Sequence, residues 1–174
     1  MPDTIKSLAD LNAAFADNTN GVIAPQDIRD LMVSMMVHGE IGSGAKAAIT
    51  LPLLYQQLDL TLAGLVGRGL TIDTANKRIA DVPVAMKAWV DVEVAFNGAN
   101  NTTFDFSVFR NGVQEARLTD SVRIVSTAMI GRVNFGASIQ LAAGDALDLR
   151  GKSAVAASFT LLRAALRVRR IGVE

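Results

Sequence analysis

The sequence predicts a mostly β fold, an antiparallel jelly-roll sandwich preceded by a short N-terminal helical hairpin. Apolar residues recur every three or four positions at the beginning of the chain, which is typical of helices, and alternate with polar residues later, which is typical of strands. About eight to ten short strands follow one another at intervals of roughly 8 to 12 residues, and this spacing favours an antiparallel sandwich. A jelly roll is the commonest eight-stranded solution.

The composition limits the classes of function that we expect. The 174 residues include 17 Lys and Arg against 17 Asp and Glu, so no net field attracts nucleic acid or an anionic membrane, and we expect neither partner. The absence of cysteine excludes disulfides and thiolate metal sites, and we expect no cofactor. No signal peptide or long apolar run is present, which predicts a soluble chain made in a cytoplasm. The positive mean hydropathy suggests apolar surface that an oligomer would cover.

Two apolar stripes predict the helical hairpin. The first stripe is Leu8, Leu11 and Phe15. A polar turn at residues 17–21 follows, and a second helix is expected to begin at Pro25, whose fixed φ suits the first helical position. The second stripe is Ile28, Leu31, Met32, Met35 and Met36.

The second stripe has two explanations. It could pack against the first helix and the neighbouring domain, or it could dock on other subunits, for which pliable methionine is suited. Residues 39–44 are rich in glycine and predict a flexible joint after this stripe. We therefore divide the chain into an N-terminal helical segment at residues 1–40 and a β-jelly-roll domain at residues 41–174.

Alternation with a period of two predicts the strands of the sandwich. The expected strands are residues 50–60, 70–74, 77–84, 86–96, 103–108, 132–141, 147–149 and 162–169. Tight turns are expected at residues 74–77, 97–101, 111–112 and 143–145. The Asn111-Gly112 pair is typical of a type I′ hairpin, in which both central residues have positive φ.

Several stretches resemble small phage virion fibre or decoration proteins with a C-terminal trimeric C1q/TNF-like jelly roll. The stretches are residues 15–30, 96–104, 109–113, 136–145 and 165–171. One departure is Ala24, which stands where the resemblance would place a serine N-cap. The resemblance implies a homotrimer on a particle surface, and it carries no reaction signature.

Five residues are candidates for the contact between subunits. Trp89 alternates onto the charged side of its strand, where a large aromatic side chain needs cover, and Phe109 is a second candidate. An intramolecular loop is the alternative cover for both. The basic cluster of the last strand includes Arg163, Arg167 and Arg169, for which we expect salt bridges between subunits rather than contacts to nucleic acid.

Two sets of residues could carry chemistry. His38 is the single histidine, and we expect a surface or helix C-terminal role for it rather than catalysis. Asp91, Glu93 and Asp105 could meet on one polar face, where they would hold Ca²⁺ or act as an acid and base pair, or form a solvated face with salt bridges.

These observations together predict a structural protein on a virion surface and no enzyme. We expect a trimeric surface decoration or short head fibre whose N-terminal helices bind capsid or tail proteins. The alternative is a tail fibre or receptor-binding protein that contacts the host surface, with a loop of Asn97, Asn100, Asn101 and Thr102 as the contact. A third interpretation is a glycan-cleaving enzyme that uses the carboxylates of residues 91, 93 and 105.

Overall fold

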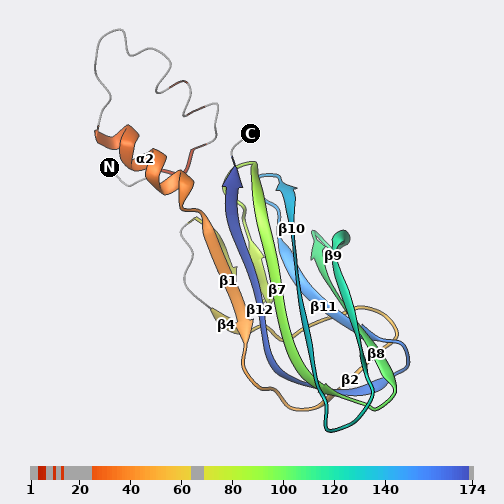
Figure 1. The fold of residues 1–174 in the computed structure, drawn as a ribbon. Coiled ribbons are helices and arrows are strands. Elements are labelled where there is room, and N and C mark those ends of the chain that lie inside the picture. Colours follow the sequence, from red (N-terminus) through yellow and green to blue (C-terminus); the bar gives the residue numbers. More distant parts are fainter. Residues whose placement is uncertain (1–3, 7–9, 11–12, 14–24, 64–68, 173–174) are drawn as a thin grey trace.

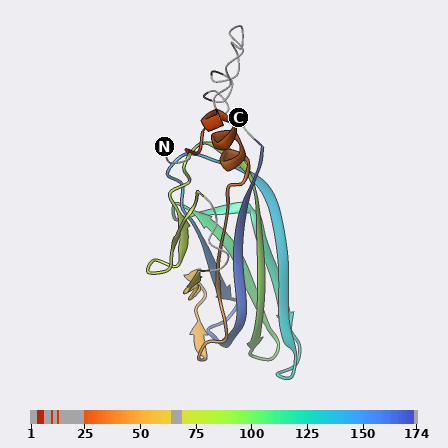
Figure 2. The ribbon, with the colours of Figure 1, turned by 90° about the vertical axis from the view of Figure 1, so that its left-hand side faces the viewer.

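The computed structural model describes residues 4–6, 10, 13, 25–63 and 69–172. These residues form a two-layer β-sandwich with one helix at one end (Figure 1). The helix is α2 (Pro25–Met35), and it leads directly into the first strand. The side view in Figure 2 shows the two layers and the position of α2 above them.

The first sheet has six antiparallel strands. Its order is β10 (Ile130–Leu141), β7 (Met86–Gly98), β12 (Ala157–Gly172), β1 (His38–Ser43) and β4 (Leu62–Ala63), and β2 (Ile49–Leu51) pairs with β12. Strand β1 pairs over its whole length with part of β12, which is distant in sequence, so the first and last strands of the sandwich are neighbours.

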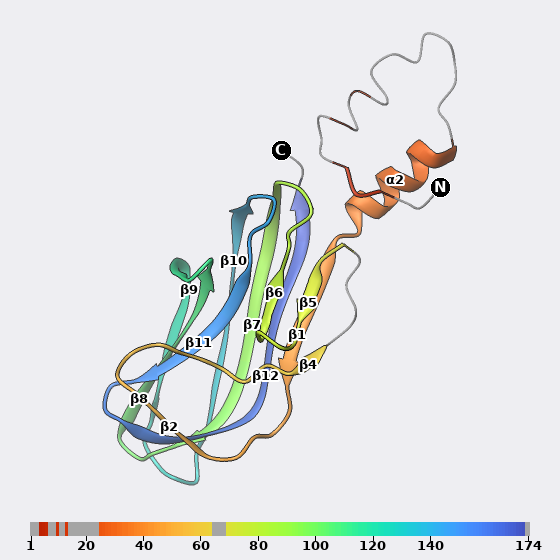
Figure 3. The same ribbon diagram turned by 180° about the vertical axis from the view of Figure 1, so that it is seen from behind.

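The second sheet also has six antiparallel strands. Its order is β5 (Thr71–Asp73), β6 (Arg78–Ala80), β11 (Leu147–Ser153), β8 (Thr102–Arg110) and β9 (Val113–Ile124), and β3 (Gln56–Gln57) pairs with β11. Figure 3 shows β5 and β6 in front of the first sheet, seen from behind.

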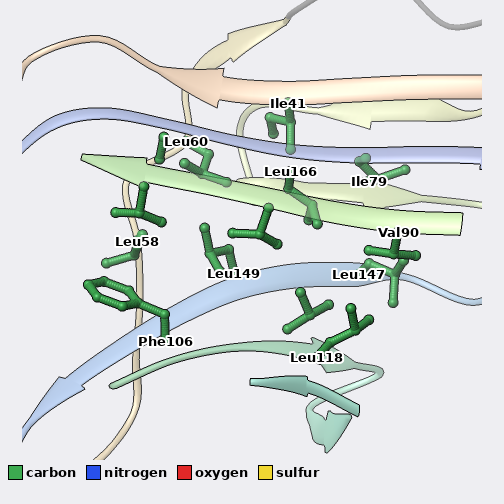
Figure 4. Packing of buried hydrophobic residues seen from close by; sticks show 14 of the residues in the cluster. Ile41, Leu58, Leu60, Ile79, Val90, Phe106, Leu118, Leu147, Leu149 and Leu166 are labelled. Atoms are coloured by element: carbon green, nitrogen blue, oxygen red, sulfur yellow. The ribbon is translucent and has the colours of Figure 1, made fainter. Parts of the chain in front are cut away.

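The core lies between the sheets. Along β7 the inward residues Ala88, Val90, Val92, Val94 and Phe96 are fully buried, as the period-two pattern predicts. At one end of the core, Phe96 lies 5.0 Å from Phe104, 5.2 Å from Phe106 and 4.9 Å from Phe159 between ring centroids. Aliphatic residues from both sheets fill the rest of the interior (Figure 4). Burial of apolar surface therefore holds the two layers together.

The turns follow the predicted chemistry. Asn111 and Gly112 have φ of 51° and 81°, which confirms the left-handed turn between β8 and β9. Lys77 and Gly144 also have positive φ, within the turns expected at residues 74–77 and 143–145.

The predicted helical hairpin is corrected to a single helix. Among the described residues of the N-terminal part, only α2 has defined bounds, although Asp10 and Ala13 are also helical. Leu8, Leu11 and Phe15 lie outside the described residues.

The flexible joint predicted at residues 39–44 is wrong, because β1 occupies residues 38–43. Two of the three glycines there, Gly39 and Gly42, serve close packing, whereas Gly44 follows the strand and has open space around it. A Cβ on Gly42 would lie 2.9 Å from the carbonyl oxygen of Ala164, and one on Gly39 would lie 3.1 Å from Ile72 Cδ1. The boundary drawn after residue 40 consequently falls inside a strand.

Two further strand predictions need correction. The strand expected at residues 50–60 is divided into β2 and β3, which are separated by Pro52 and its neighbours. Strand β9 was not predicted, because most of its residues are exposed and polar and give no alternation. Within the part of the chain that the structure describes, no helix is long and apolar enough to cross a membrane.

Candidate functional site

The outer face of the first sheet brings together four of the five predicted subunit-contact residues. The antiparallel register aligns Trp89 with Arg169 on one side and with Ser138 on the other. One row further, Asp91 is opposite Arg167, which in turn is opposite Glu40. Arg163 reaches the same face, where its Nη2 lies 3.5 Å from Glu93. We call the set Glu40, Trp89, Asp91, Glu93, Arg163, Arg167 and Arg169 the sheet-face cluster.

Arg167 is the centre of this cluster. Its Nε donates to Glu40 Oε2 at 3.0 Å, its Nη1 to Asp91 Oδ2 at 3.3 Å, and its Nη2 to Glu93 Oε2 at 3.5 Å. Burial by itself would lower the pKa of Arg167, but the hydrogen bonds and charges of Glu40 and Asp91 outweigh it, so the pKa is raised. Arg167 and its three carboxylates are thus already paired within one chain, and a partner could cover them without leaving this guanidinium unpaired.

A shallow depression of about 280 Å³ lies between β1, β7 and β12 on this face. His38 lies at its edge, is exposed, and places Nδ1 2.8 Å from the Met36 carbonyl oxygen. His38 is the first residue of β1, and its exposure matches the surface role expected for the histidine.

Trp89 is half-buried because Gly136 makes room for its ring. A Cβ on Gly136 would lie 3.2 Å from Trp89 Cζ2, so the indole lies over this glycine. One side of the ring is therefore packed inside the chain, and the remaining exposed part is available for contact. Its place at a subunit interface remains a prediction.

Phe109 lies on the other sheet and is covered within its own chain. Its ring packs edge-on against Tyr55 at 5.2 Å, and the Arg150 guanidinium lies 4.2 Å from the ring centroid. Only 8% of Phe109 is exposed. The intramolecular alternative explains this residue, and Phe109 does not join the sheet-face cluster.

The three carboxylates that could have formed one site are divided between the sheets. Asp91 and Glu93 share Arg167 on the first sheet, whereas Asp105 lies on β8 and pairs with Lys152 at 3.6 Å. Across residues 4–6, 10, 13, 25–63 and 69–172, no three His, Cys, Asp or Glu side chains are grouped to hold a metal ion. The grouping of residues 91, 93 and 105 is therefore wrong.

Helix α2 presents its apolar stripe to solvent. Ile28, Met32, Met35 and Met36 are 49%, 57%, 67% and 49% exposed, and Leu31 is half-buried. These four side chains are therefore not buried against the sandwich, and that part of the first explanation is wrong. The stripe of the first helix, which is the other part of that explanation, lies outside the described residues.

The polar side of α2 is buried instead. The backbone N–H of Thr4 donates to Asp30 Oδ1 at 2.8 Å, and the N–H of Lys6 donates to Ser34 Oγ at 2.7 Å. The Lys6 ammonium lies 3.1 Å from Asp30 Oδ2. The Thr4 amide, together with Gln26 and Lys6, lowers the pKa of Asp30, and the hydrogen bond to Asp30 is the main cause that raises the pKa of Lys6.

Arg170 connects α2 to the sandwich. Its Nη1 donates to the Ser34 carbonyl oxygen at 2.7 Å, in the last turn of the helix where carbonyls lack intrahelical partners. The side chain is buried, and desolvation lowers its pKa. Sequence reasoning missed Arg170, Asp30 and Ser34 as contacts; the spacing of Asp30 and Ser34 by four residues, opposite the apolar stripe, was the available signal.

The loop considered for receptor contact lies at the end of the sandwich opposite α2, where β7 turns into β8 (Figures 1 and 2). Asn97, Asn100 and Asn101 are exposed, and Asn101 has a φ of 57°. Thr102 is buried, and its hydroxyl donates to the Asn100 carbonyl oxygen at 3.3 Å. Three of the four residues are thus accessible, and Thr102 supports the turn.

Comparison with solved structures identifies the architecture. The chain is similar to the structure of Eiger TNF from S. frugiperda, with a TM-score of 0.59 and 11% sequence identity, covering 79% of this chain and 95% of that chain. No family model and no curated protein matches the sequence. At this identity the likeness shows the fold alone, which is a TNF-like jelly-roll sandwich of two antiparallel sheets.

Proposed function

We propose that this chain is a structural protein of a phage virion, a trimeric surface decoration or short head fibre that α2 attaches to other virion subunits. The observation that carries the proposal is the orientation of α2, whose apolar stripe faces solvent while its polar side is bonded to the rest of the chain. A helix in water normally turns its apolar side inward, so an outward stripe favours a partner that covers it.

The methionines of α2 suit a docking role. Met32, Met35 and Met36 have flexible, polarisable side chains that adapt to the shape of an apolar groove. Arg170 of β12 holds the helix to the sandwich, and Lys6 holds residues 4–6 to the helix, so that the stripe is presented in one orientation. Preorganisation of this kind reduces the entropy that binding loses.

Trimer formation is the second part of the proposal. The TNF-like fold is typically trimeric. The sheet-face cluster supports a contact on the first sheet, since it combines a half-exposed indole with five charged residues that are paired inside one chain, Glu40, Asp91, Glu93, Arg163 and Arg167. Such a face can be covered by another copy with little cost from unpaired charge.

Incorporation into particles tests the attachment role. Met32→Glu combined with Met35→Glu places two charges on the stripe, and we expect a folded trimer that is missing from purified virions. Val113→Glu is the matched control, because Val113 is 71% exposed on β9 and should tolerate the charge. Normal incorporation of the double variant would remove the attachment claim.

A tail fibre or receptor-binding protein is the second candidate, favoured by the exposed asparagines of the β7–β8 turn at the end opposite α2. Replacement of Asn97 and Asn100 with alanine separates the two roles. Reduced adsorption of intact particles to the host would support receptor contact, and unchanged adsorption would support decoration.

A further inference from the structure

A pocket of about 280 Å³ opens at one edge of the sandwich, away from the sheet-face cluster and α2. One wall is the segment 46–49, which is tied to the first sheet because the Lys46 N–H donates to the Leu161 carbonyl oxygen at 2.9 Å. The other wall is Leu58 and Asp59, tied to the second sheet by the Leu58 N–H, which donates to the Leu149 carbonyl oxygen at 2.9 Å. The pocket therefore lies where the two layers separate.

The floor of the pocket is apolar and rigid. Leu58, Phe159 and Leu161 line it and are almost completely buried. Phe159 belongs to the four-phenylalanine group of the core, with its centroid 4.9 Å from that of Phe96, so its ring cannot easily move to fill the space. Next to Leu161, the pairing of β12 with β7 is interrupted by a register shift, an irregularity that is frequent beside functional sites.

The rim of the pocket carries charge on one side. The Lys46 ammonium donates to Thr61 Oγ1 at 2.7 Å and lies 3.1 Å from Asp59 Oδ2. Asp59 Oδ1 lies 3.0 Å from the Lys77 ammonium, and these two lysines lower the pKa of Asp59. The carboxylate of Asp59 thus forms ion pairs with two ammonium groups. The contacts described for Lys46 use two of the three N–H donors of its ammonium.

We propose that this pocket binds a small amphipathic anion, with its apolar group along the exposed side chains of Ala47 and Ile49 above this floor and its anionic head on the Lys46 ammonium. The volume sets the size of the apolar group. An engineered cavity of about 150 Å³ holds benzene, and ordinary ligand pockets begin near about 300 Å³, so a chain of roughly six to ten carbons fits. The head supplies the oxygen acceptor for the third donor of Lys46. The proposal does not depend on the virion role.

Calorimetric titration of the full chain with octanoate tests the proposal. We expect saturable binding in the millimolar range or tighter, and about tenfold weaker binding to Lys46→Gln, because a charge-assisted hydrogen bond is lost. Neutral 1-octanol should bind Lys46→Gln and the unaltered protein equally. Ala47→Trp should abolish binding of both compounds, since Ala47 lines the pocket.

Ala48→Trp is the matched control, because Ala48 is exposed next to Ala47 but does not line the pocket. It should bind octanoate as the unaltered chain does. No saturable octanoate binding, or equal binding by the two tryptophan variants, would overturn the site. An equal loss of octanoate and octanol binding in Lys46→Gln would overturn the assignment of the anionic head to Lys46.

Discussion

Helix α2 and the β-sandwich differ in where their apolar residues lie, because those of the sandwich are buried and those of α2 are exposed. In β7, Val90, Val92 and Val94 point into the core and are fully buried, whereas Met32 and Met35 of α2 are more than half exposed. The buried side of α2 is polar and consists of Asp30 and Ser34. The sandwich is thus held by the hydrophobic effect, and the orientation of α2 is set by directional hydrogen bonds and by the ion pairs of Lys6 with Asp27 and Asp30.

This difference supports the docking role that we propose for α2. The sandwich buries its apolar residues in its own core, but α2 leaves its apolar stripe exposed to water, and exposed apolar patches are typical of binding surfaces. The contacts that hold α2 come from residues far apart in sequence, since Ser34 accepts from Arg170 through its carbonyl and from Lys6 through its hydroxyl. We infer that α2 is held in place for contact with another molecule.

The largest difference in the free energy of unfolding is expected when one side chain in each region is replaced by alanine. Phe96→Ala removes a ring that packs on Phe104, Phe106 and Phe159, and should lower the free energy of unfolding by about 4 kcal/mol. Met35→Ala should change it by no more than about 0.5 kcal/mol, because the side chain is exposed. Chemical denaturation followed by circular dichroism measures both. A large loss in Met35→Ala would mean that the stripe is already covered in the free protein.

A smaller effect is expected at the connection between the two regions. Arg170→Gln removes the bond to the Ser34 carbonyl and should weaken the docking of α2 by about 2 kcal/mol, while the centre of β7 stays unchanged. Amide hydrogen exchange would detect this as faster exchange in α2 alone. Arg169→Gln, at the exposed neighbouring position, is the control. Equal exchange of α2 in both variants would show that Arg170 does not hold the helix.

The smallest effect is a dependence of α2 docking on pH. The pKa of Asp30 in the folded chain is below its ordinary value of about 3.9, mainly because of the Thr4 amide. The contribution of Asp30 to stability is therefore present above the unfolded pKa and is lost as the pH falls through the folded pKa. Exchange in α2 should accelerate below about pH 4 relative to β7, beyond the intrinsic pH dependence of exchange. Asp30→Asn should remove this acid dependence, and its persistence in the variant would assign it to another group.

Local patterns predicted most of the sandwich but not its exceptions. Alternation identified β7, β8 and β10, and the Asn111-Gly112 pair identified a turn, because these features depend on neighbours in sequence. Strand β1 was mistaken for a joint, since the need for glycine at Gly42 comes from Ala164, a residue more than a hundred positions away. Strand β9 lacks an apolar side and gave no periodic signal.

The candidate site shows the same limit. Alternation placed Trp89 and Arg167 on the outward sides of their strands, and the structure brings both onto one face. The alternation does not indicate which sheet a strand joins. Asp105 was therefore grouped with Asp91, although the two residues lie in different sheets. The role of Arg170 depends on a contact with α2 across 136 positions, and no local pattern contains that information.

The mass of the full chain in dilute solution tests the central claim most directly. Light scattering should give three times the 18.4 kDa of one chain, and Trp89→Glu should lower the mass, whereas the control Val113→Glu should not. A stable species of 18.4 kDa, or a Trp89→Glu trimer as stable as the unaltered one, would contradict the proposed assembly through the first sheet.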